Sequence, residues 1–346
     1  MNDMLISNVL LDGASTDILI SSGRFSRIAR HGSIALSEGC KLFDASGMAI
    51  VPAFYNTHTH AAMTLLRGYA DDMPLQKWLA EYIWPFEDGL TPEDIGNGSR
   101  IAIEEMIGSG SVFFSDMYFE IDETIRAVEE MGVRAAIGVT MMENQQLTVR
   151  EEKFALLHNW KDNDHRRVML TTAQRAIYTC GEQLLRDCTR LAAETNTRLH
   201  IHISETKQEV ADCLKAHGTT PVRYLDKIGL LGPNVIAAHV VHVDKEEIQI
   251  LARRGVTVVH NPCSNMKLGS GRFPYELAIK SGVRIALGTD GVSSNNNLDL
   301  REEMKFAALL AKVAGDPELL PAEQVLDWAT RGGAEARSER AQRFQE

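Results

Sequence analysis

The sequence contains no cluster of basic residues, and its formal net charge at pH 7 is −11. An acidic chain without a basic patch argues against binding to nucleic acid or to an anionic membrane. No long apolar run is present that would cross a membrane, and no basic start followed by an apolar stretch indicates a secretory signal. We therefore expect a cytoplasmic protein with no membrane or nucleic-acid partner.

Cysteine is scarce and shows no pairing pattern. The five cysteines include no Cys-x-x-Cys pair, and an odd number cannot all pair with one another. We expect free, buried thiols in a reducing compartment. No repeat or low-complexity segment is present either. A chain of 346 residues can bury a large core, and a single barrel with an appendage fits that length.

Short apolar strands alternate with helical stretches along most of the chain. Strands are predicted near residues 48–51, 111–115, 133–139, 168–172, 198–203, 235–238, 256–260 and 284–287. Helices are predicted between them, for example over 91–107, 122–131, 181–195, 206–216 and 244–252. This order predicts a (β/α)₈ barrel. The alternative, an open doubly wound sheet, has no support because no Gly-x-Gly-x-x-Gly turn follows an early strand.

The predicted organisation has three parts. Residues 1–47 contain three strand-like pieces divided by Ser, Gly and Asp turns, which indicates a small β subdomain. Residues 48–333 form the predicted catalytic barrel. Residues 334–346 are a polar tail without a strand pattern.

Metal-ligand residue types follow four of the predicted strands. His58 and His60 come after the first strand, and His202, His239 and Asp290 close later ones. Barrels of this kind place their chemistry at the carboxyl ends of the strands. Neutral imidazoles and a carboxylate suit zinc and similar divalent metals. A single histidine at a strand end is an ordinary coincidence, but four such ends predict a metal site.

Several of these residues have a plainer interpretation. Glu205 follows His202 by three residues and can be a carboxylate at a helix N-terminus, and Asp290 before a glycine can be a turn residue. The recurrence at strand ends favours catalytic roles for both. For three further histidines we favour structural positions or positions beside the ligands over metal binding: His200, His242 and His260.

Longer motifs surround these residues. They occupy residues 56–68, 70–75, 83–87, 202–206, 260–265, 288–291 and 294–299. Together they resemble the amidohydrolase superfamily, and more narrowly its methylthioadenosine/S-adenosylhomocysteine deaminase branch, which is related to cytosine deaminases and chlorohydrolases. The resemblance spans about residues 48 to 333. As a set, these motifs are highly specific.

The resemblance implies one divalent metal, Zn²⁺ by preference and Fe²⁺ or Mn²⁺ as alternatives. Its implied ligands are His58, His60, His202 and Asp290. Three nitrogens and one carboxylate leave a position for water, as a catalytic site requires. Many amidohydrolases hold two metals bridged by a modified lysine on strand four. Residues 168–175 contain no lysine, so we expect a single metal.

The resemblance also implies the acid–base groups of a hydrolytic deamination. Asp290 would accept the proton of the attacking water. Glu205 would carry a proton to the ring nitrogen of an aminated heterocycle, which makes the adjacent carbon electrophilic. His239 would hydrogen-bond the attacking oxygen and stabilise the charge that develops there.

Substrate contacts are less uniform. In the resembled enzymes the counterpart of Glu87 contacts ribose hydroxyls, and Arg150 falls where an amino-acid carboxylate can bind. Val139 occupies the place of a second arginine, which weakens the case for S-adenosylhomocysteine. Arg175 replaces a histidine that contacts the purine, and a donor-only guanidinium suits a carbonyl or anionic group instead. Arg272 replaces a usually aliphatic position, so a plain adenosine specificity is in doubt.

We therefore expect a metal-dependent hydrolytic deaminase that converts an aminated purine nucleoside, of the methylthioadenosine, adenosine or S-adenosylhomocysteine type, to its oxo product and ammonia. Alternatives are a deaminase or chlorohydrolase of another heterocycle, such as a pterin, a guanine-like base or a triazine, or an inactive truncated homologue. The last arises because residues 336–346 lack the strands that complete the small subdomain in the resembled family. Unpaired edges in that subdomain would favour low stability or a homo-oligomer.

Overall fold

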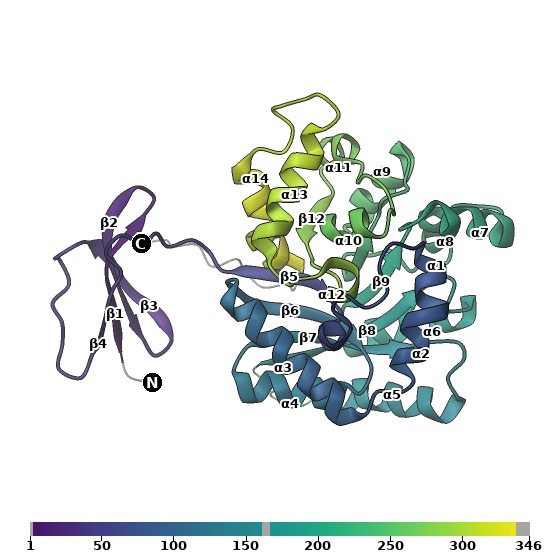
Figure 1. Ribbon diagram of the computed structural model, residues 1–346, viewed down its shortest axis with the longest axis horizontal. Coiled ribbons are helices and arrows are strands. Elements are labelled where there is room, and N and C mark those ends of the chain that lie inside the picture. Colours follow the sequence, from purple (N-terminus) through teal and green to yellow (C-terminus); the bar gives the residue numbers. More distant parts are fainter. Residues whose placement is uncertain (1–2, 161–166, 337–346) are drawn as a thin grey trace. The chain divides into compact units, whose positions relative to one another are not determined.

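The structure, a computed structural model, describes residues 3–160 and 167–336. Contacts divide the chain into two compact units, one that runs to Ala53 and one that begins at Phe54 (Figure 1). The sequence pattern had placed this division at residue 48. The polar tail lies outside the described residues, apart from its first three.

The first unit contains one four-stranded sheet. Its order is β3-β2-β1-β4, with β1 (Met4–Leu11), β2 (Ala14–Ser21), β3 (Arg24–Arg30) and β4 (Lys41–Asp44). The first three strands confirm the three predicted pieces. The fourth was missed because all four of its residues are exposed and show no alternation. It pairs in parallel with β1, so each strand of this unit has a partner within it, and β3 and β4 form the two edges of the sheet.

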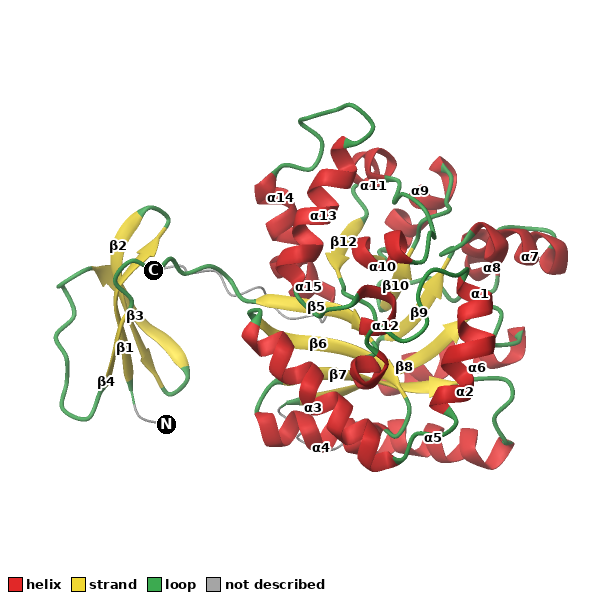
Figure 2. Cartoon of the chain, viewed as in Figure 1, coloured by secondary structure: helices red, strands yellow, loops and turns green. Residues whose placement is uncertain are grey.

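The second unit is the predicted (β/α)₈ barrel, with strands inside and helices outside (Figure 2). Its strands are neighbours in chain order: β5 (Phe54–Thr59), β6 (Ser111–Tyr118), β7 (Arg134–Met141), β8 (Val168–Ala176), β9 (Leu199–Ile203), β10 (Val235–His239), β11 (Thr257–His260) and β12 (Arg284–Leu287). Every pairing between the described strands of this sheet is parallel. The carboxyl ends of all eight strands therefore meet at one rim.

Helices connect the strands. The long ones are α3 (Pro92–Gly108), α4 (Ile121–Met131), α5 (Leu147–Trp160), α6 (Glu182–Thr195), α7 (Lys207–His217), α9 (Lys245–Arg254) and α13 (Leu300–Lys312). The shorter ones are η1 (Ala61–Leu66), α1 (Leu75–Trp78), η2 (Leu79–Ile83), α2 (Trp84–Glu87), α8 (Pro221–Lys227), α10 (Pro262–Lys267), α11 (Tyr275–Ser281), α12 (Val292–Asn295), α14 (Ala322–Asp327), η3 (Trp328–Gly332) and α15 (Gly333–Ala336). Gly132, Gly255 and Gly282 end α4, α9 and α11 in the left-handed conformation, which glycine adopts without steric cost.

The first barrel strand lies further along the chain than predicted. Residues 48–51 are not a barrel strand: Met48 and Val51 are each 52% exposed, and Ala49 forms a bridge with Leu10 of the first unit. The barrel strand is β5, which contains His58 itself. The apolar run misled the prediction because β5 buries polar residues whose hydrogen bonds are satisfied only in the tertiary structure.

The two ends of the barrel sheet, β5 and β12, are joined by hydrogen bonds. The Thr57 hydroxyl donates to the Leu287 carbonyl at 2.5 Å, and the Asp290 N–H donates to the His58 carbonyl at 2.9 Å. These bonds close the barrel and place the residues after β12 directly beside those of β5.

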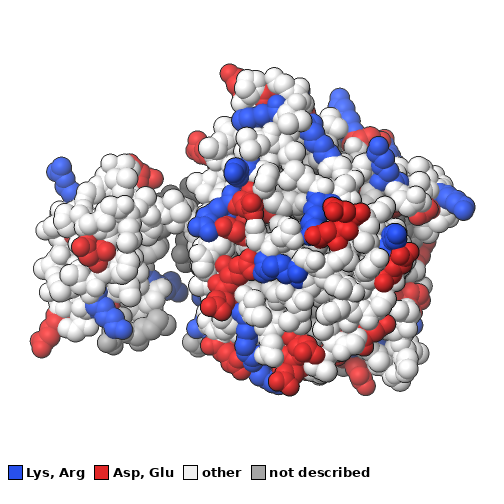
Figure 3. Space-filling model, in the orientation of Figure 1, with Lys and Arg blue, Asp and Glu red and all other residues white. Residues whose placement is uncertain are grey.

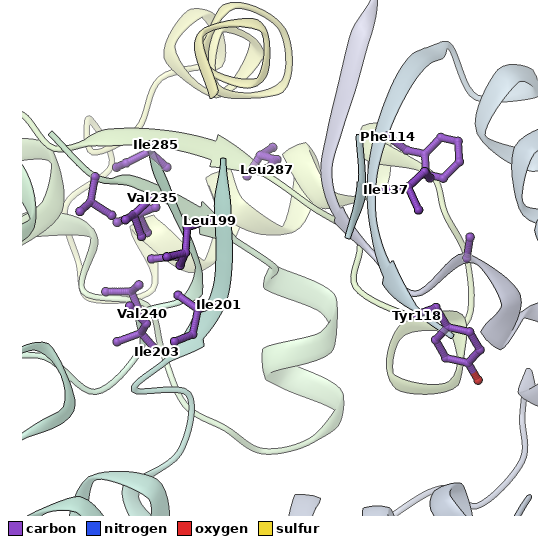
Figure 4. Packing of buried hydrophobic residues seen from close by; sticks show 14 of the residues in the cluster. Phe114, Tyr118, Ile137, Leu199, Ile201, Ile203, Val235, Val240, Ile285 and Leu287 are labelled. Carbon is purple, nitrogen blue, oxygen red and sulfur yellow. The ribbon is translucent and has the colours of Figure 1, made fainter. Parts of the chain in front are cut away.

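Apolar side chains fill the space between strands and helices. Figure 4 shows members of this cluster, among them Phe114, Ile137, Ile201, Val235 and Leu287, each from a different barrel strand and each buried. A core that draws on all sides of the barrel holds the strand ends in place, because close-packed interiors tolerate little displacement.

No helix in the described parts of the chain combines the length and apolar character needed to cross a membrane. On the face in Figure 3, acidic and basic side chains of the barrel are interspersed rather than gathered by sign.

Candidate metal centre and active site

Four imidazoles converge at the carboxyl ends of β5, β9 and β10. The His58 ring centroid lies 5.0 Å from that of His60, 4.8 Å from that of His202 and 5.6 Å from that of His239. All four side chains are buried. The structure therefore brings together the histidines that the sequence placed at three separate strand ends.

Each of these imidazoles is anchored through Nδ1. His60 Nδ1 lies 2.6 Å from the Met117 carbonyl, His202 Nδ1 lies 2.5 Å from the Arg175 carbonyl, and His239 Nδ1 lies 2.8 Å from Asn265 Oδ1. His58 Nδ1 lies 3.0 Å from Nε2 of His200. Such partners fix the tautomer and the ring direction of metal-binding histidines. As a result, Nε2 is the atom left to face the centre.

Asp290 completes the cluster from the residues after β12. Its Oδ1 lies 3.4 Å from His58 Nε2 and 3.2 Å from His60 Nε2. Its Oδ2 accepts hydrogen bonds from Ser264 Oγ at 2.6 Å and from Ser294 Oγ at 3.1 Å. Burial alone would raise the pKa of this carboxyl, but the facing imidazoles of His58 and His60 hold it well below its usual value. Asp290 is therefore ionised at neutral pH.

The donor set fits a divalent cation. Two overlapping groups have ligand atoms within 4.8 Å of one another: His58, His60 and Asp290, and His58, His202 and His239. His58 Nε2 and His239 Nε2 are buried without a hydrogen-bond partner among the described residues. A buried polar atom without a partner is costly. Imidazole nitrogens and a carboxylate are the donors that zinc takes in catalytic sites, and such an ion would satisfy these atoms.

Glu205 faces this cluster from the turn after β9. Its side chain is 5% exposed, and its Oε1 accepts a hydrogen bond from Ser270 Oγ at 3.2 Å. Its Oε2 lies 3.8 Å from His239 Nε2. Burial raises the pKa of Glu205. For His239 burial acts in the opposite direction, but the carboxylates of Glu205 and Asp290 raise its pKa. Both shifts favour the protonated forms of this pair.

The backbone at this rim is strained. Ser204, His239 and Asp290 have φ values of 52°, 72° and 62°. The left-handed region costs a non-glycine residue about 1–3 kcal/mol, and such residues concentrate at functional sites. Here the strain occurs where three of the converging strands end.

Two cavities adjoin the cluster. The inner one has a volume of about 40 Å³ and is lined by His60, His202, Glu205, His239, Asp290 and neighbouring apolar residues. The outer one, which we call the outer chamber, has a volume of about 920 Å³. Arg175 and Tyr178 line both, so these two side chains form the boundary between the metal centre and the larger space.

The three predicted substrate contacts, Glu87, Arg150 and Arg175, do not all line the outer chamber. Glu87 and Arg175 line the outer chamber. Arg150 is not among the lining residues. Its Nη1 lies 3.7 Å from Glu143 Oε1, so its charge faces a carboxylate of this chain. Arg272, singled out as a departure near this region, pairs with Glu276 on α11 at 2.8 Å.

The remaining histidines behave as expected for structural residues. His242 Nε2 lies 2.5 Å from the Ser270 carbonyl, and His260 Nε2 lies 2.7 Å from the Tyr275 hydroxyl. Ser264 and Asn265, which orient Asp290 and His239, were not assigned roles from the sequence. The sequence pointed to them only through the motif at residues 260–265. Their roles became visible when the fold brought this segment next to His239 and Asp290.

The comparisons with known proteins agree with this geometry. The model of the amidohydrolase family matches residues 49–339. A 5-methylthioadenosine/S-adenosylhomocysteine deaminase from Pelotomaculum thermopropionicum is 42% identical over an alignment of 348 positions, gaps included, which covers 95% of this chain and 80% of that protein. A 5′-deoxyadenosine deaminase from Methanosphaera stadtmanae is 44% identical over 308 residues, which cover 88% of this chain and 72% of that protein.

A solved structure agrees as well. The crystal structure of an adenosine deaminase from Xanthomonas campestris with bound zinc has a TM-score of 0.89 and 33% identity, and the match covers 96% of this chain and 79% of that one. The fold and the site define a metal-dependent hydrolase that acts on carbon–nitrogen bonds. The chain belongs to the amidohydrolase family.

Proposed function

We propose that this protein is a hydrolytic deaminase of purine nucleosides, which converts an adenine-type base to its oxo form with release of ammonia. The observation that carries the proposal is the convergence of His58, His60, His202 and Asp290 on a cavity that Glu205 also lines. The activities for which the relatives are named support a nucleoside as the substrate class.

We assign His58, His60, His202 and Asp290 as the ligands of one divalent metal, zinc by preference because the related adenosine deaminase carries it. When bound, this ion would supply a Lewis acid that lowers the pKa of water toward about 7. A single ion is favoured because β8 contains no lysine that a second metal would need as a bridge.

The chain's own residues then move the protons. Asp290 is ionised and accepts a proton from the attacking water. Glu205, whose pKa is raised by burial, delivers a proton to the ring nitrogen beside the amino-bearing carbon. The water oxygen bonds to that carbon, and Asp290 passes the proton that it accepted to the amino group. The carbon–nitrogen bond to the amino group then breaks and ammonia leaves, while the remaining proton of the new hydroxyl returns to Glu205 and the carbonyl forms. The reaction consumes one water and needs no other co-reactant.

His239 stabilises the attacking oxygen. Its Nδ1 faces Asn265 Oδ1, so that nitrogen carries a proton. Nε2 then donates a hydrogen bond when the ring is protonated, which the raised pKa favours. A donor aimed at developing charge inside a buried cavity contributes more than the same donor in water.

The nucleoside would place its base between Arg175 and Tyr178 and its sugar against Glu87. Both carboxylate oxygens of Glu87 are buried without a hydrogen-bond partner among the described residues, and ribose hydroxyls are suitable donors. We do not assign Arg150 to the substrate, because its guanidinium faces Glu143.

Ammonia release tests the proposal. Zinc-loaded protein is assayed with adenosine, 5′-methylthioadenosine, 5′-deoxyadenosine and S-adenosylhomocysteine, and metal content is measured in the same sample. We expect turnover of at least one of these, and a loss of about 10²–10⁴-fold in Glu205→Gln at unchanged zinc content. Stoichiometric zinc without ammonia from any nucleoside would overturn the proposal.

Arg175 favours a second candidate, the deamination of a heterocycle that already carries a carbonyl oxygen, such as a pterin or an oxidised purine. A guanidinium offers only hydrogen-bond donors. It therefore pairs with a carbonyl oxygen and not with a protonated ring nitrogen, which needs a hydrogen-bond acceptor. Guanine, pterins and aminotriazines therefore belong in the same assay. If the Arg175→His variant gains adenosine turnover, the result supports a nucleoside as the substrate. If it loses pterin turnover instead, the result supports the second candidate.

A further inference from the structure

The outer chamber carries strong charge asymmetry. Five acidic side chains line it, and Arg175 is the one arginine among its lining residues; no lysine lines it. The acidic residues are Glu87, Asp88, Glu120, Glu143 and Glu182. With a volume of about 920 Å³, the space is large enough to take a substituent beyond the nucleoside itself. The wall of the outer chamber therefore presents mostly negative charge to the part of the substrate that does not enter the inner cavity.

Some of these carboxylates are already neutralised by the chain. Glu182 pairs with Arg186 at 2.8 Å, and Glu143 faces Arg150 at 3.7 Å and accepts the Gly181 N–H at 3.1 Å. Among the described residues, neither Asp88 nor Glu120 has an ion-pair partner within 4.0 Å, although the charge of Lys153 acts on Glu120 from a longer distance. The chamber therefore keeps unneutralised negative charge at its wall.

Glu87 shows that this wall is built to receive donors. Its side chain is 9% exposed, and neither carboxylate oxygen has a hydrogen-bond partner among the described residues. Burial raises the pKa of Glu87, while the charge of Arg175 acts against this rise. An unpartnered carboxylate in such a position gains most from a ligand that brings N–H or O–H groups.

Arg175 does not reverse this preference. Its guanidinium carbon lies 5.8 Å from the centre of the Phe119 ring, at the boundary with the inner cavity. Its charge is thus directed to the base end of the substrate. The only other arginine predicted for an anionic group, Arg150, is held by Glu143 and is not a lining residue.

We propose that the outer chamber selects nucleosides by the charge of their 5′ substituent: it accepts neutral or cationic, donor-bearing groups and rejects carboxylates and phosphates. This rests on the proposed function, because the base must bind at the metal centre for the 5′ side to reach the chamber. Like charges brought together without a counter-ion repel one another and weaken binding. A carboxylate-bearing substrate such as S-adenosylhomocysteine is then a poorer substrate than a nucleoside with the same base and a neutral 5′ group.

Three nucleosides that differ only at the 5′ position test the inference: 5′-deoxyadenosine, 5′-amino-5′-deoxyadenosine and adenosine 5′-monophosphate. The kcat/KM of the zinc-loaded enzyme is measured for each at low and high salt. We expect the amine to equal or exceed the neutral nucleoside and the phosphate to fall at least about tenfold below it. We expect the difference between amine and phosphate to shrink at high salt, because salt screens charges near solvent.

Charge-neutralising variants locate the effect. Glu120→Gln and Glu143→Gln each remove one charge from the chamber wall and should reduce the amine-to-phosphate ratio. Glu129→Gln removes one exposed charge from α4, outside the chamber lining, and should leave the ratio as it is. A phosphate that is turned over as well as the amine, or a ratio that no chamber variant changes, would overturn the inference. Loss of all activity, the neutral nucleoside included, would instead count against the proposed function.

Discussion

The Glu209 carboxylate holds the backbone that presents Glu205. Glu209 Oε2 accepts the N–H of Glu205 at 2.8 Å, and its Oε1 accepts the N–H of Ser204 at 2.8 Å. Ser204 is in the left-handed conformation, and Glu209 is 3% exposed. One buried carboxylate on α7 therefore fixes the strained turn between β9 and α7, and with it the direction of the Glu205 side chain.

Replacing Glu209 should lower catalysis through Glu205. Glu209→Gln keeps one acceptor and turns an amide N–H₂ toward the second backbone donor, so one bond to the turn is lost. Because small misplacements of a catalytic group are costly, we expect kcat to fall about tenfold or more. We also expect the basic limb of the kcat/KM–pH profile to shift, since Glu205 must be protonated to donate and activity is lost as pH rises through its pKa in the free enzyme.

Two controls accompany this variant. Zinc content should be unchanged, and Glu246→Gln, an exposed change on α9, should retain the parent profile. If the loss of activity follows thermal stability alone and the pH profile keeps its shape, Glu209 is only structural.

Metal retention should separate His202 from His239. Both share a possible cation position with His58, but only His202 is assigned as a ligand. We expect His202→Ala to lose bound zinc and activity together. His239→Ala should keep close to one zinc per chain and lose about 10²–10³ in kcat, because it removes a donor to the attacking oxygen. The measurement is the zinc content of each variant after dialysis. Loss of zinc from His239→Ala would show that His239 is also a ligand.

Glycines where η3 and α15 pack against the barrel should be intolerant of any side chain. A Cβ on Gly332 would lie 2.2 Å from the Ile285 carbonyl oxygen, and one on Gly333 would lie 2.4 Å from Tyr55 Cβ. Both distances are far below contact, and the first partner is backbone. We expect each Gly→Ala change to lower the free energy of unfolding by about 1–3 kcal/mol or more.

Gly108 offers the matched control for these variants. It is the last residue of α3, and a Cβ there meets nothing within 4 Å. Since alanine favours helix over glycine, Gly108→Ala should be neutral or stabilising by up to about 1 kcal/mol. Denaturant unfolding of the three variants, compared by midpoint and slope, checks the expectation.

Glu303 should make stability depend on pH. This fully buried carboxyl accepts the Cys263 N–H at 3.1 Å and Asn295 Nδ2 at 2.5 Å, and burial raises its pKa to about 8. The folded state thus binds this proton more tightly than the unfolded state, whose pKa is about 4.3. The free energy of unfolding should therefore fall as pH rises between these two values, and the effect should be complete above the folded pKa.

Glu303→Gln cannot titrate, so its stability should decline less steeply with pH over that range. The difference between variant and parent, measured by unfolding at several pH values, isolates Glu303 from other groups. Glu323→Gln, an exposed change on α14, should follow the parent curve. Parallel curves for Glu303→Gln and the parent would contradict the assigned pKa.

Much of the barrel could be predicted because its elements are encoded locally. Strand and helix periods, helix-ending glycines and histidines at strand ends are visible in short windows of sequence. The exceptions have physical causes. β5 was displaced because its buried polar residues, such as Asn56 and Thr57, are satisfied only by partners from β12 and the residues after it. β4 was missed because its exposed residues carry no pattern.

The residues that orient the site could not be found in the same way. Met117 and Arg175 anchor His60 and His202 through backbone carbonyls, which every residue possesses. Glu209 and Glu303 read in sequence as ordinary helical glutamates, and only burial distinguishes them. The sequence predicts Arg150 as a substrate contact and does not reveal that the fold places its guanidinium 3.7 Å from Glu143.

The sequence by itself determined the class of fold, because strand and helix patterns are local. It also predicted the metal-ligand residues and the reaction, through residue types at strand ends and motifs that resemble a known family. Only the tertiary structure decided which nitrogen of each imidazole faces the centre, how the turn at Glu205 is held, and that the outer chamber is acidic. Those properties arise from contacts between residues far apart in the chain, such as His58 with His200, and no local window of sequence contains them.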